Sequence, residues 1–255
     1  MKKIYIVCAL FFLVAGCVKT PIFNDKAITQ EDDVTRAATN ERRYGTIYDF
    51  PVRPGTPEWE IFETTEEMLK ACQLPESILA TASTRDLAAI CLDYPLYFIY
   101  IAYNDKRMGM NIMIEQFNGF EELSRRKDGT LELMEIYRTF PVLTSAQPKS
   151  SPDYHTPYKL PFLELLMASD VFSNQLDNQS AAELGKIVLE KYENKLTNIH
   201  IYGLYGIQTT LLLGAVSIDK NSASEKSPVV KQFIENFSYA EPSLITEISQ
   251  IISSL

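Results

Sequence analysis

The stretch SAAELGKIVLEKYENKL, residues 180–196, decides the fold class. Ser180, followed by Glu183 three positions later, is a capping box and predicts that a helix begins at Ser180. The apolar residues that follow recur at spacings of three and four, the period of one helix face: Leu184, Ile187, Val188 and Tyr192. The stretch is therefore expected to be an amphipathic helix with one face in a core.

Similar signals recur along the rest of the chain. Helical apolar spacing is also found over residues 87–94 and 244–252, and no stretch combines strand alternation with a hairpin turn. Irregular segments are expected at 141–158, which contains four prolines, and at 219–227. Further helix starts are predicted at Thr56-Pro57-Glu58, Thr64-x-x-Glu67, Ser83, Ser227-Pro228 and Glu241-Pro242. The chain is predicted to be all-α.

Two arrangements of these helices remain open. Residues 83–119 and 180–218 both run from a cap through an amphipathic helix into tyrosine-rich and further apolar helices. Such an echo is expected of a HEAT-like solenoid of helical hairpins, in which each unit packs on its neighbours. An irregular α–α array in a single domain gives a similar pattern by chance, so both architectures stand.

The N-terminus has the parts of an export signal. Lys2 and Lys3 precede the apolar run Ile4–Val14, which is shorter than the roughly 20 residues that a spanning helix needs. The run ends in Ala15-Gly16-Cys17, which resembles the bacterial lipobox. That resemblance implies cleavage before Cys17 and lipidation of its thiol and amino group. The alternatives are an ordinary secretory signal or a short membrane anchor.

This signal fixes the expected organisation of the chain. Residues 1–16 are the signal peptide, 17–45 a polar tether without apolar periodicity, and 46–255 the helical domain. Acyl chains would hold the protein on a membrane of the bacterial cell envelope. The first acid after the cysteine is Asp25, unlike the acidic export signal of some surface lipoproteins of the Bacteroidota, which favours the periplasmic side. The short apolar runs 96–102 and 211–216 are expected to be buried helix.

Charge narrows the range of partners. Without Lys2 and Lys3 the mature chain of 239 residues has 22 basic and 33 acidic side chains, a formal charge of −11. An acidic surface repels phosphate backbones, so a nucleic-acid partner is not expected.

Two cysteines remain once Cys8 is removed and Cys17 is acylated. Cys72 and Cys91 would share a compartment in which disulfides form, so a bridge between them is one reading. The other is two buried free thiols, the usual state of an unpaired cysteine in a core.

Motifs for catalysis are missing from the sequence. His155 and His200 have no helical histidine partner, and no H-E-x-x-H, G-x-S-x-G, phosphate loop or calcium loop occurs. No catalytic residue, metal ligand or cofactor is assigned on this basis. Acids are plentiful, and a converging pair could hydrolyse glycosides, although acids in helices usually face solvent. The acids considered are Glu66, Glu67, Glu121, Glu122, Glu132, Glu135 and Glu164.

Tyrosines concentrate in two short stretches. Tyr97 and Tyr100 lie in one, and Tyr202 and Tyr205 in the other. Core packing explains such residues most simply. The alternative is that they line a groove for a peptide or glycan, because tyrosine combines a large rigid ring with a polar tip.

Several segments resemble a family of secreted proteins and lipoproteins of the Bacteroidota to which no activity is assigned. They are FPVRPGTPEW (50–59), KACQLPE (70–76), CLDYPL (91–96), FNGFEEL (117–123) and YGLYG (202–206). The resemblance spans most of the mature chain and implies an envelope location.

These observations predict a membrane-anchored envelope lipoprotein that acts as a non-enzymatic binding or scaffold module. Its partner beyond the membrane would be a protein, a peptide or a glycan. The alternative is a carboxylate-based hydrolase of an envelope or dietary polymer.

Overall fold

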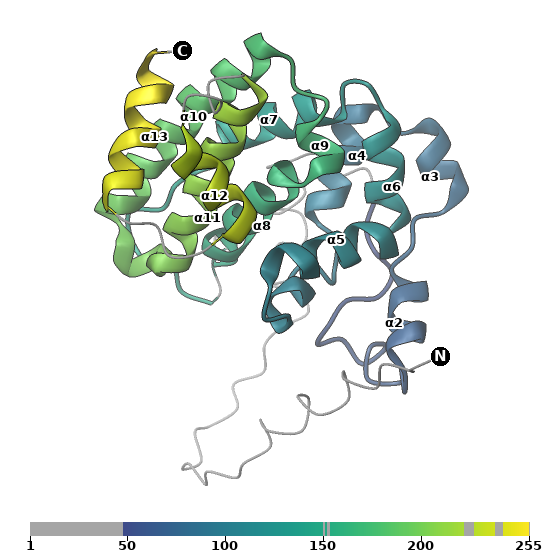
Figure 1. The fold of residues 1–255 in the computed structure, drawn as a ribbon. Coiled ribbons are helices and arrows are strands. Elements are labelled where there is room, and N and C mark those ends of the chain that lie inside the picture. The colour runs from purple at the N-terminus through teal and green to yellow at the C-terminus, as the bar shows by residue number, and fades with distance from the viewer. Residues whose placement is uncertain (1–47, 150, 152–153, 222–226, 238–241, 255) are drawn as a thin grey trace, which may run out of the picture. The chain divides into compact units, whose positions relative to one another are not determined.

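The computed structural model describes residues 48–149, 151, 154–221, 227–237 and 242–254, all within one compact unit that spans residues 38–255. These residues form helices and no strand, which confirms the all-α prediction. The predicted signal 1–16, Cys17 and the tether 17–45 lie outside the described residues. The helices, drawn in Figure 1, are α2 (Thr65–Ala71), α3 (Glu76–Thr81), α4 (Thr84–Leu92), the 3₁₀ turn η1 (Ile99–Ala102), α5 (Lys106–Gln116), α6 (Asn118–Arg125), α7 (Gly129–Thr139), α8 (Thr156–Ala168), α9 (Asp170–Ser173), α10 (Asn178–Thr197), α11 (Ile199–Lys220), α12 (Pro228–Asn236) and α13 (Pro242–Ser254).

Local capping chemistry explains where several helices begin. The Thr64 hydroxyl accepts a hydrogen bond from the Glu67 backbone N–H, and the Glu67 carboxylate accepts from the Thr64 N–H in return. The capping box predicted for α2 is thereby confirmed. Ser83 and Ser227 accept from the N–H three residues further on, at the starts of α4 and α12. Each cap satisfies N–H groups that the helix itself leaves without a partner.

The predicted start of α10 at Ser180 is wrong by three residues. The N-cap is Asp177, whose carboxylate accepts from the Ser180 backbone N–H at 2.7 Å, and Ser180 occupies the third helical position. An acid is favoured at this place because its charge also meets the positive end of the helix dipole. The hydrogen bonds from Ser180 lower the pKa of Asp177.

The helix start predicted at Thr56-Pro57-Glu58 is also wrong. The chain there makes successive turns, in which the N–H of Trp59 bonds to the Thr56 carbonyl and the N–H of Phe62 to the Trp59 carbonyl. These bonds span three residues rather than four. Ile61 is 74% exposed, so the segment has no continuous apolar face whose burial would stabilise an α-helix.

The described residues of the proline-rich segment are irregular, as predicted, but the segment is shorter than expected. Helix α7 ends at Thr139 and α8 begins at Thr156, inside the range predicted to be irregular. Pro157 lies in the first turn of α8, where a missing N–H costs no hydrogen bond.

Helices α8 and α11 pack against each other in the interior (Figure 1). All side chains from Leu160 to Ala168 and from Thr209 to Ile218 are buried. This confirms that residues 211–216 are buried helix. Within the described ranges α11 alone has the length and apolar composition of a membrane span, yet 72% of that stretch is buried by its neighbours.

The other short apolar run, residues 96–102, is not a buried helix. It forms turns and η1, and Ile101 is 49% exposed. Pro95 gives the physical reason, because a proline restricts the residue before it and interrupts a helix that would otherwise continue from α4.

Polar side chains link four helix ends that are not consecutive in the chain, those of α3, α6, α9 and α11. Four side chains each reach back to an earlier helix end: Arg126 to the carbonyls of Leu79 and Ala82, Gln175 to the carbonyl of Ser124, Lys220 to the Asn174 side chain, and Asn221 to the carbonyl of Asn178. The bonded residues lie 43 to 51 positions apart in the sequence. This turn ladder ties the chain after α3 to the chain after α6, α9 and α11.

Candidate functional site

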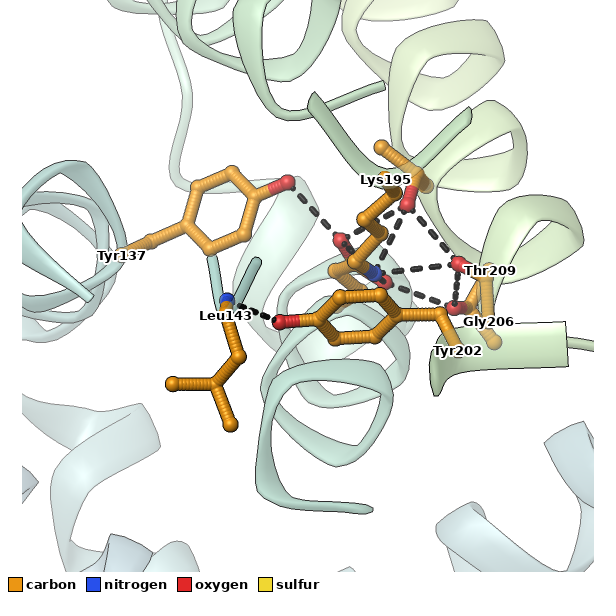
Figure 2. Close-up of polar contacts among 8 residues, drawn as sticks. Tyr137, Leu143, Lys195, Tyr202, Gly206 and Thr209 are labelled. Carbon is orange, nitrogen blue, oxygen red and sulfur yellow. Dashed lines mark hydrogen bonds and ion pairs between the residues drawn. The ribbon is translucent and has the colours of Figure 1, made fainter. Parts of the chain in front are cut away.

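A carboxylate and an ammonium group are buried together at the centre of the helices. Glu164 of α8 and Lys195 of α10 form an ion pair at 2.7 Å, and neither side chain has any exposed surface. We call these two residues and their hydrogen-bond partners the buried hub (Figure 2). Isolated charges are costly to bury, so their partners decide whether such a pair is tolerated.

The Glu164 carboxylate is held by four side chains. Oε1 accepts from the Tyr137 hydroxyl at 2.9 Å, and Thr209 donates to Oε2 at 2.6 Å. Thr210 lies within 2.9 Å of Oε1, and Lys195 bonds to both oxygens at 2.7 Å. Burial raises the pKa of Tyr137 and the Glu164 charge raises it further, which keeps the phenol protonated as a donor.

The Lys195 ammonium is equally well surrounded. Besides Glu164 it donates to the Gly206 carbonyl at 3.0 Å and to the Thr210 hydroxyl at 2.9 Å. Its Nζ also lies 5.3 Å from the centre of the Tyr202 ring. Burial lowers the pKa of Lys195, and the Glu164 charge opposes that shift.

Two further contacts connect the residues around the hub to the end of α7 and to the segment that follows it. Lys191, one turn before Lys195, donates to the Arg138 and Phe140 carbonyls at 3.1 and 2.6 Å, where α7 leaves carbonyls without helical partners. The Tyr202 hydroxyl accepts from the Leu143 backbone N–H at 2.6 Å (Figure 2). The hub therefore joins α7, α8, α10, α11 and the start of the proline-rich segment.

A break in α11 allows this arrangement. Gly203 has φ 64° and ψ 176°, a conformation open to glycine and strained for other residues. It separates the first turn of α11, which carries Tyr202, from the long buried part that carries Thr209 and Thr210.

Two of the four tyrosines singled out in the sequence are enclosed in the core, and the other two are partly buried against it. Tyr100 and Tyr202 are core residues, with 2% and 6% of their surface exposed. Tyr97 and Tyr205 are half-buried against the same core. Tyr97 and Tyr100 both pack on the ring of Phe162, two residues before Glu164. The structure thus brings these tyrosines around α8 and the hub.

A second polar group lies at the surface beside them. Asp93, at the end of α4, accepts from Arg53 on Oδ2 at 2.5 Å and from Lys159 on Oδ1 at 3.2 Å. Arg53 also bonds to Asp49 at 3.1 Å. Each of the three paired side chains keeps about a third of its surface exposed. Two segments of the family resemblance, 50–59 and 91–96, meet at this Arg53–Asp93 contact.

Aromatic side chains contact the charged residues of this polar group. The Lys159 ammonium lies 5.6 Å from the centre of the Tyr97 ring, and the Tyr97 hydroxyl is 3.4 Å from Nδ1 of His155. Tyr158 is 56% exposed. Burial raises the pKa of Tyr97 to about 12, whereas burial and the Lys159 charge lower the pKa of His155, so both are neutral at neutral pH. We call Arg53, Asp93, Tyr97, His155, Tyr158 and Lys159 the Asp93 cluster.

Sequence reasoning missed most of this cluster and the role of Glu164. Arg53 and Asp93 lie 40 residues apart, and His155 lies far from both in the sequence, so no local pattern brings these residues together. A usable signal for the hub exists, because Glu164 is the sole charged residue of an otherwise apolar run, residues 160–168.

The remaining candidate acids do not converge. Glu67 caps α2, and the others except Glu66 pair with arginines from their own or a neighbouring helix. The pairs are Glu121 with Arg125, Glu122 with Arg126, Glu132 with Arg85 and Glu135 with Arg138. In the part of the chain that the structure describes, no three His, Cys, Asp or Glu side chains are grouped to hold a metal ion.

Cys72 and Cys91 are free thiols in the structure, so the bridge that the sequence left open is not formed. Both are fully buried. Burial raises the pKa of Cys72 to about 11, and it raises the pKa of Cys91 as well. Neither thiol is therefore activated as a nucleophile.

Alkylation should test this assignment. In the native protein we expect iodoacetamide to modify neither Cys72 nor Cys91, because burial blocks access and suppresses the thiolate. In urea without a reductant both should react, as read by mass spectrometry of their peptides. If the two peptides resist alkylation in urea until a reductant is added, a disulfide is present and the assignment is wrong.

Comparisons with protein-family models, curated proteins and solved structures find no match to this chain. The fold and the site consequently define the protein only as an all-α protein with a buried ionic hub and an adjoining polar, aromatic surface cluster.

Proposed function

We propose that this protein is a bacterial envelope lipoprotein, anchored through Cys17 and facing the periplasm, that binds a partner without catalysing a reaction. The Asp93 cluster is the observation that supports the binding role. It joins three distant segments through the contacts of Asp93 with Arg53 and Lys159, and the Tyr97 ring next to Lys159 packs on the core residue Phe162. A preformed surface of this kind binds with little loss of conformational entropy.

The turn ladder supports a scaffold role. We propose that α3–α5, α6–α8 and α9–α11 are three successive helical units, each bonded to the last through its first turn. Stacked units of this type provide extended surfaces for partners. The hydrolase alternative gains no comparable support, since among the candidate acids Glu67 caps α2, Glu164 is buried in an ion pair, and all the others except Glu66 pair with arginines.

Anchoring is tested with the full-length chain in its bacterial host. Cys17→Ala should abolish incorporation of a palmitate analogue and release the protein from membrane fractions, because the thiol and its acyl chains are lost. Cys8→Ala is the matched control, because that cysteine lies within the signal, and this variant should be labelled and membrane-bound like the wild type. Continued labelling and membrane binding of Cys17→Ala would disprove the lipoprotein proposal.

A further inference from the structure

Large apolar side chains are exposed where α10 leads into α11. Leu196 is 47% exposed, Ile199 39% and Leu204 63%. Asn198 alone separates the two helices, which pack against each other, so the chain turns back there in a tight corner (Figure 1). The Asn198 N–H bonds to the Lys195 carbonyl, and both of these side chains are buried. Leu196 and Ile199, each one position further on, lie on the outer side of the same turn, since residues three apart share a helix face.

Leu204 belongs to the same corner. It lies five positions after Ile199, so the two Cα atoms are no more than about 18 Å apart even if the chain between them were fully extended. Gly203 directly precedes it, and no atom lies within 4 Å of the place that a Cβ on this glycine would occupy. The backbone at the break in α11 is therefore open to solvent as well. We call Leu196, Ile199 and Leu204 the apolar corner.

The apolar corner lies in an uncharged part of a strongly acidic chain. The sequence has no Asp, Glu, Lys or Arg between Lys195 and Asp219, although it contains 33 acidic side chains in total. Lys195 itself is buried in the hub. The exposed polar side chains at the corner are those of Thr197 and His200. Because charged groups are costly to transfer from water into lipid, the apolar corner is a part of the surface that a bilayer can accept.

A series of side-chain contacts connects the corner with the beginning of the described chain. Burial and the neighbouring Tyr100 hydroxyl raise the pKa of Tyr205, the residue that follows the corner. Tyr100 packs on the ring of Phe162, as does Tyr97 of the Asp93 cluster. That cluster contains Arg53, a few positions after the first described residue. The corner and the place where the predicted tether joins the folded chain are thus only a few side chains apart.

We propose that the apolar corner contacts the bilayer that holds the lipid anchor, with Leu196, Ile199 and Leu204 at the boundary between headgroups and acyl chains. This inference rests on the proposed anchoring through Cys17 and adds a second membrane contact to it. About 30 residues join Cys17 to the described chain, and a chain of that length spans up to about 100 Å, so the corner can reach the same membrane. Tethering also raises the effective concentration of the bilayer, so a weak apolar contact is sufficient.

A protein partner is less well matched to this surface. Each partner in a stable protein interface buries roughly 800 Å². Three partly exposed side chains at one helix corner supply only a small part of that area. A bilayer requires no complementary shape, and its affinity for an amphipathic surface follows the apolar area that is buried.

Tryptophan fluorescence of the mature full-length chain on vesicles tests the proposal. The protein, beginning at Cys17, is coupled through that thiol to a maleimide-bearing phospholipid in vesicles of equal parts phosphatidylethanolamine and phosphatidylcholine, while Cys72 and Cys91 are buried. Trp59→Phe removes the single tryptophan of the chain, and Leu204→Trp places one in the corner. On vesicles the emission of this variant should shift to the blue, and lipids brominated on their acyl chains should quench it about twofold or more.

Val229→Trp on α12, in the same Trp59→Phe background, is the matched control, because Val229 is 45% exposed but lies outside the corner. Its emission should neither shift nor be quenched. Adding Leu196→Ser and Ile199→Ser to the Leu204→Trp protein should weaken the quenching about twofold or more, since less apolar area is then buried. Circular dichroism must show unchanged helix content, and Ile199→Trp takes the place of Leu204→Trp if that variant unfolds.

Two results would overturn the inference. One is the absence of quenching in the corner variant, or equal quenching in the Val229→Trp control. The other is a blue shift that needs no vesicles and grows with protein concentration, which would assign the corner to a second copy of the chain. Chemical coupling supplies the anchor in this experiment, so its outcome does not depend on whether Cys17 is lipidated in the cell. The palmitate experiment decides that question, and the two proposals therefore fail or stand separately.

Discussion

Glu164→Leu is expected to lower the free energy of unfolding by about 3–5 kcal/mol, because it leaves the Lys195 ammonium buried without its counter-ion. The Gly206 carbonyl and the Thr210 hydroxyl would remain as the partners of that charge. The Tyr137 hydroxyl would also lose its acceptor, whereas Thr209 could still donate to the Gly206 carbonyl at 3.1 Å. Urea denaturation followed by circular dichroism measures the loss, since the fold is all-α.

The double variant separates the contribution of the ion pair to stability from the effect of lost packing. Glu164→Leu combined with Lys195→Met removes both charges, so it should cost about 1–3 kcal/mol less than the two single changes added together. Glu121→Gln is the surface control, because its ion pair with Arg125 is largely exposed, and it should change stability by less than about 1 kcal/mol. Additive single effects would show that the buried charges are not coupled.

Phe162→Ala is expected to cost about 3–5 kcal/mol of unfolding free energy. The Phe162 side chain is fully buried, and its ring packs against those of Tyr97, Tyr100 and Phe120 at centroid distances of 5.7, 6.2 and 6.1 Å. Its removal would leave a cavity between the hub and the Asp93 cluster. The same denaturation experiment measures the effect.

Phe162→Leu provides the comparison, because it keeps most of the apolar volume while removing the aromatic contacts. It should cost clearly less than the alanine variant. Equal losses would mean that ring contacts dominate at this position, and a loss below about 1 kcal/mol for Phe162→Ala would contradict the packing described here.

The all-helical secondary structure and several helix starts could be predicted, because they depend on residues that are close together in the sequence. Thr64, Ser83 and Ser227 cap the turns that directly follow them. The error at Ser180 is also local, because Asp177 caps the helix three residues earlier and places Ser180 within its first turn.

The candidate site could not be predicted because it depends on which helices meet. The sequence does not distinguish Glu164 and Lys195 from charged residues on solvated helix faces. Their burial follows from the helices that enclose α8. Tyr100 and Tyr202 could equally have been exposed, since periodicity alone does not tell a crowded helix face from an open one. The partner of Asp93 is 40 residues away at Arg53, beyond the reach of local patterns.

The turn ladder also bears on how such a chain can change length during evolution. On the proposed division into helical units, the rungs join positions 43 to 51 residues apart in neighbouring units, so a unit added at an end of the array would leave every existing rung in place. A single residue inserted within α7 would instead rotate the following part of that helix by about 100° and turn its buried side towards solvent. The described residues of the irregular segment before α8 contribute no rung, so small insertions among them would leave the ladder in place. On this proposal, related chains should differ by units added at an end of the array or by the length of this segment.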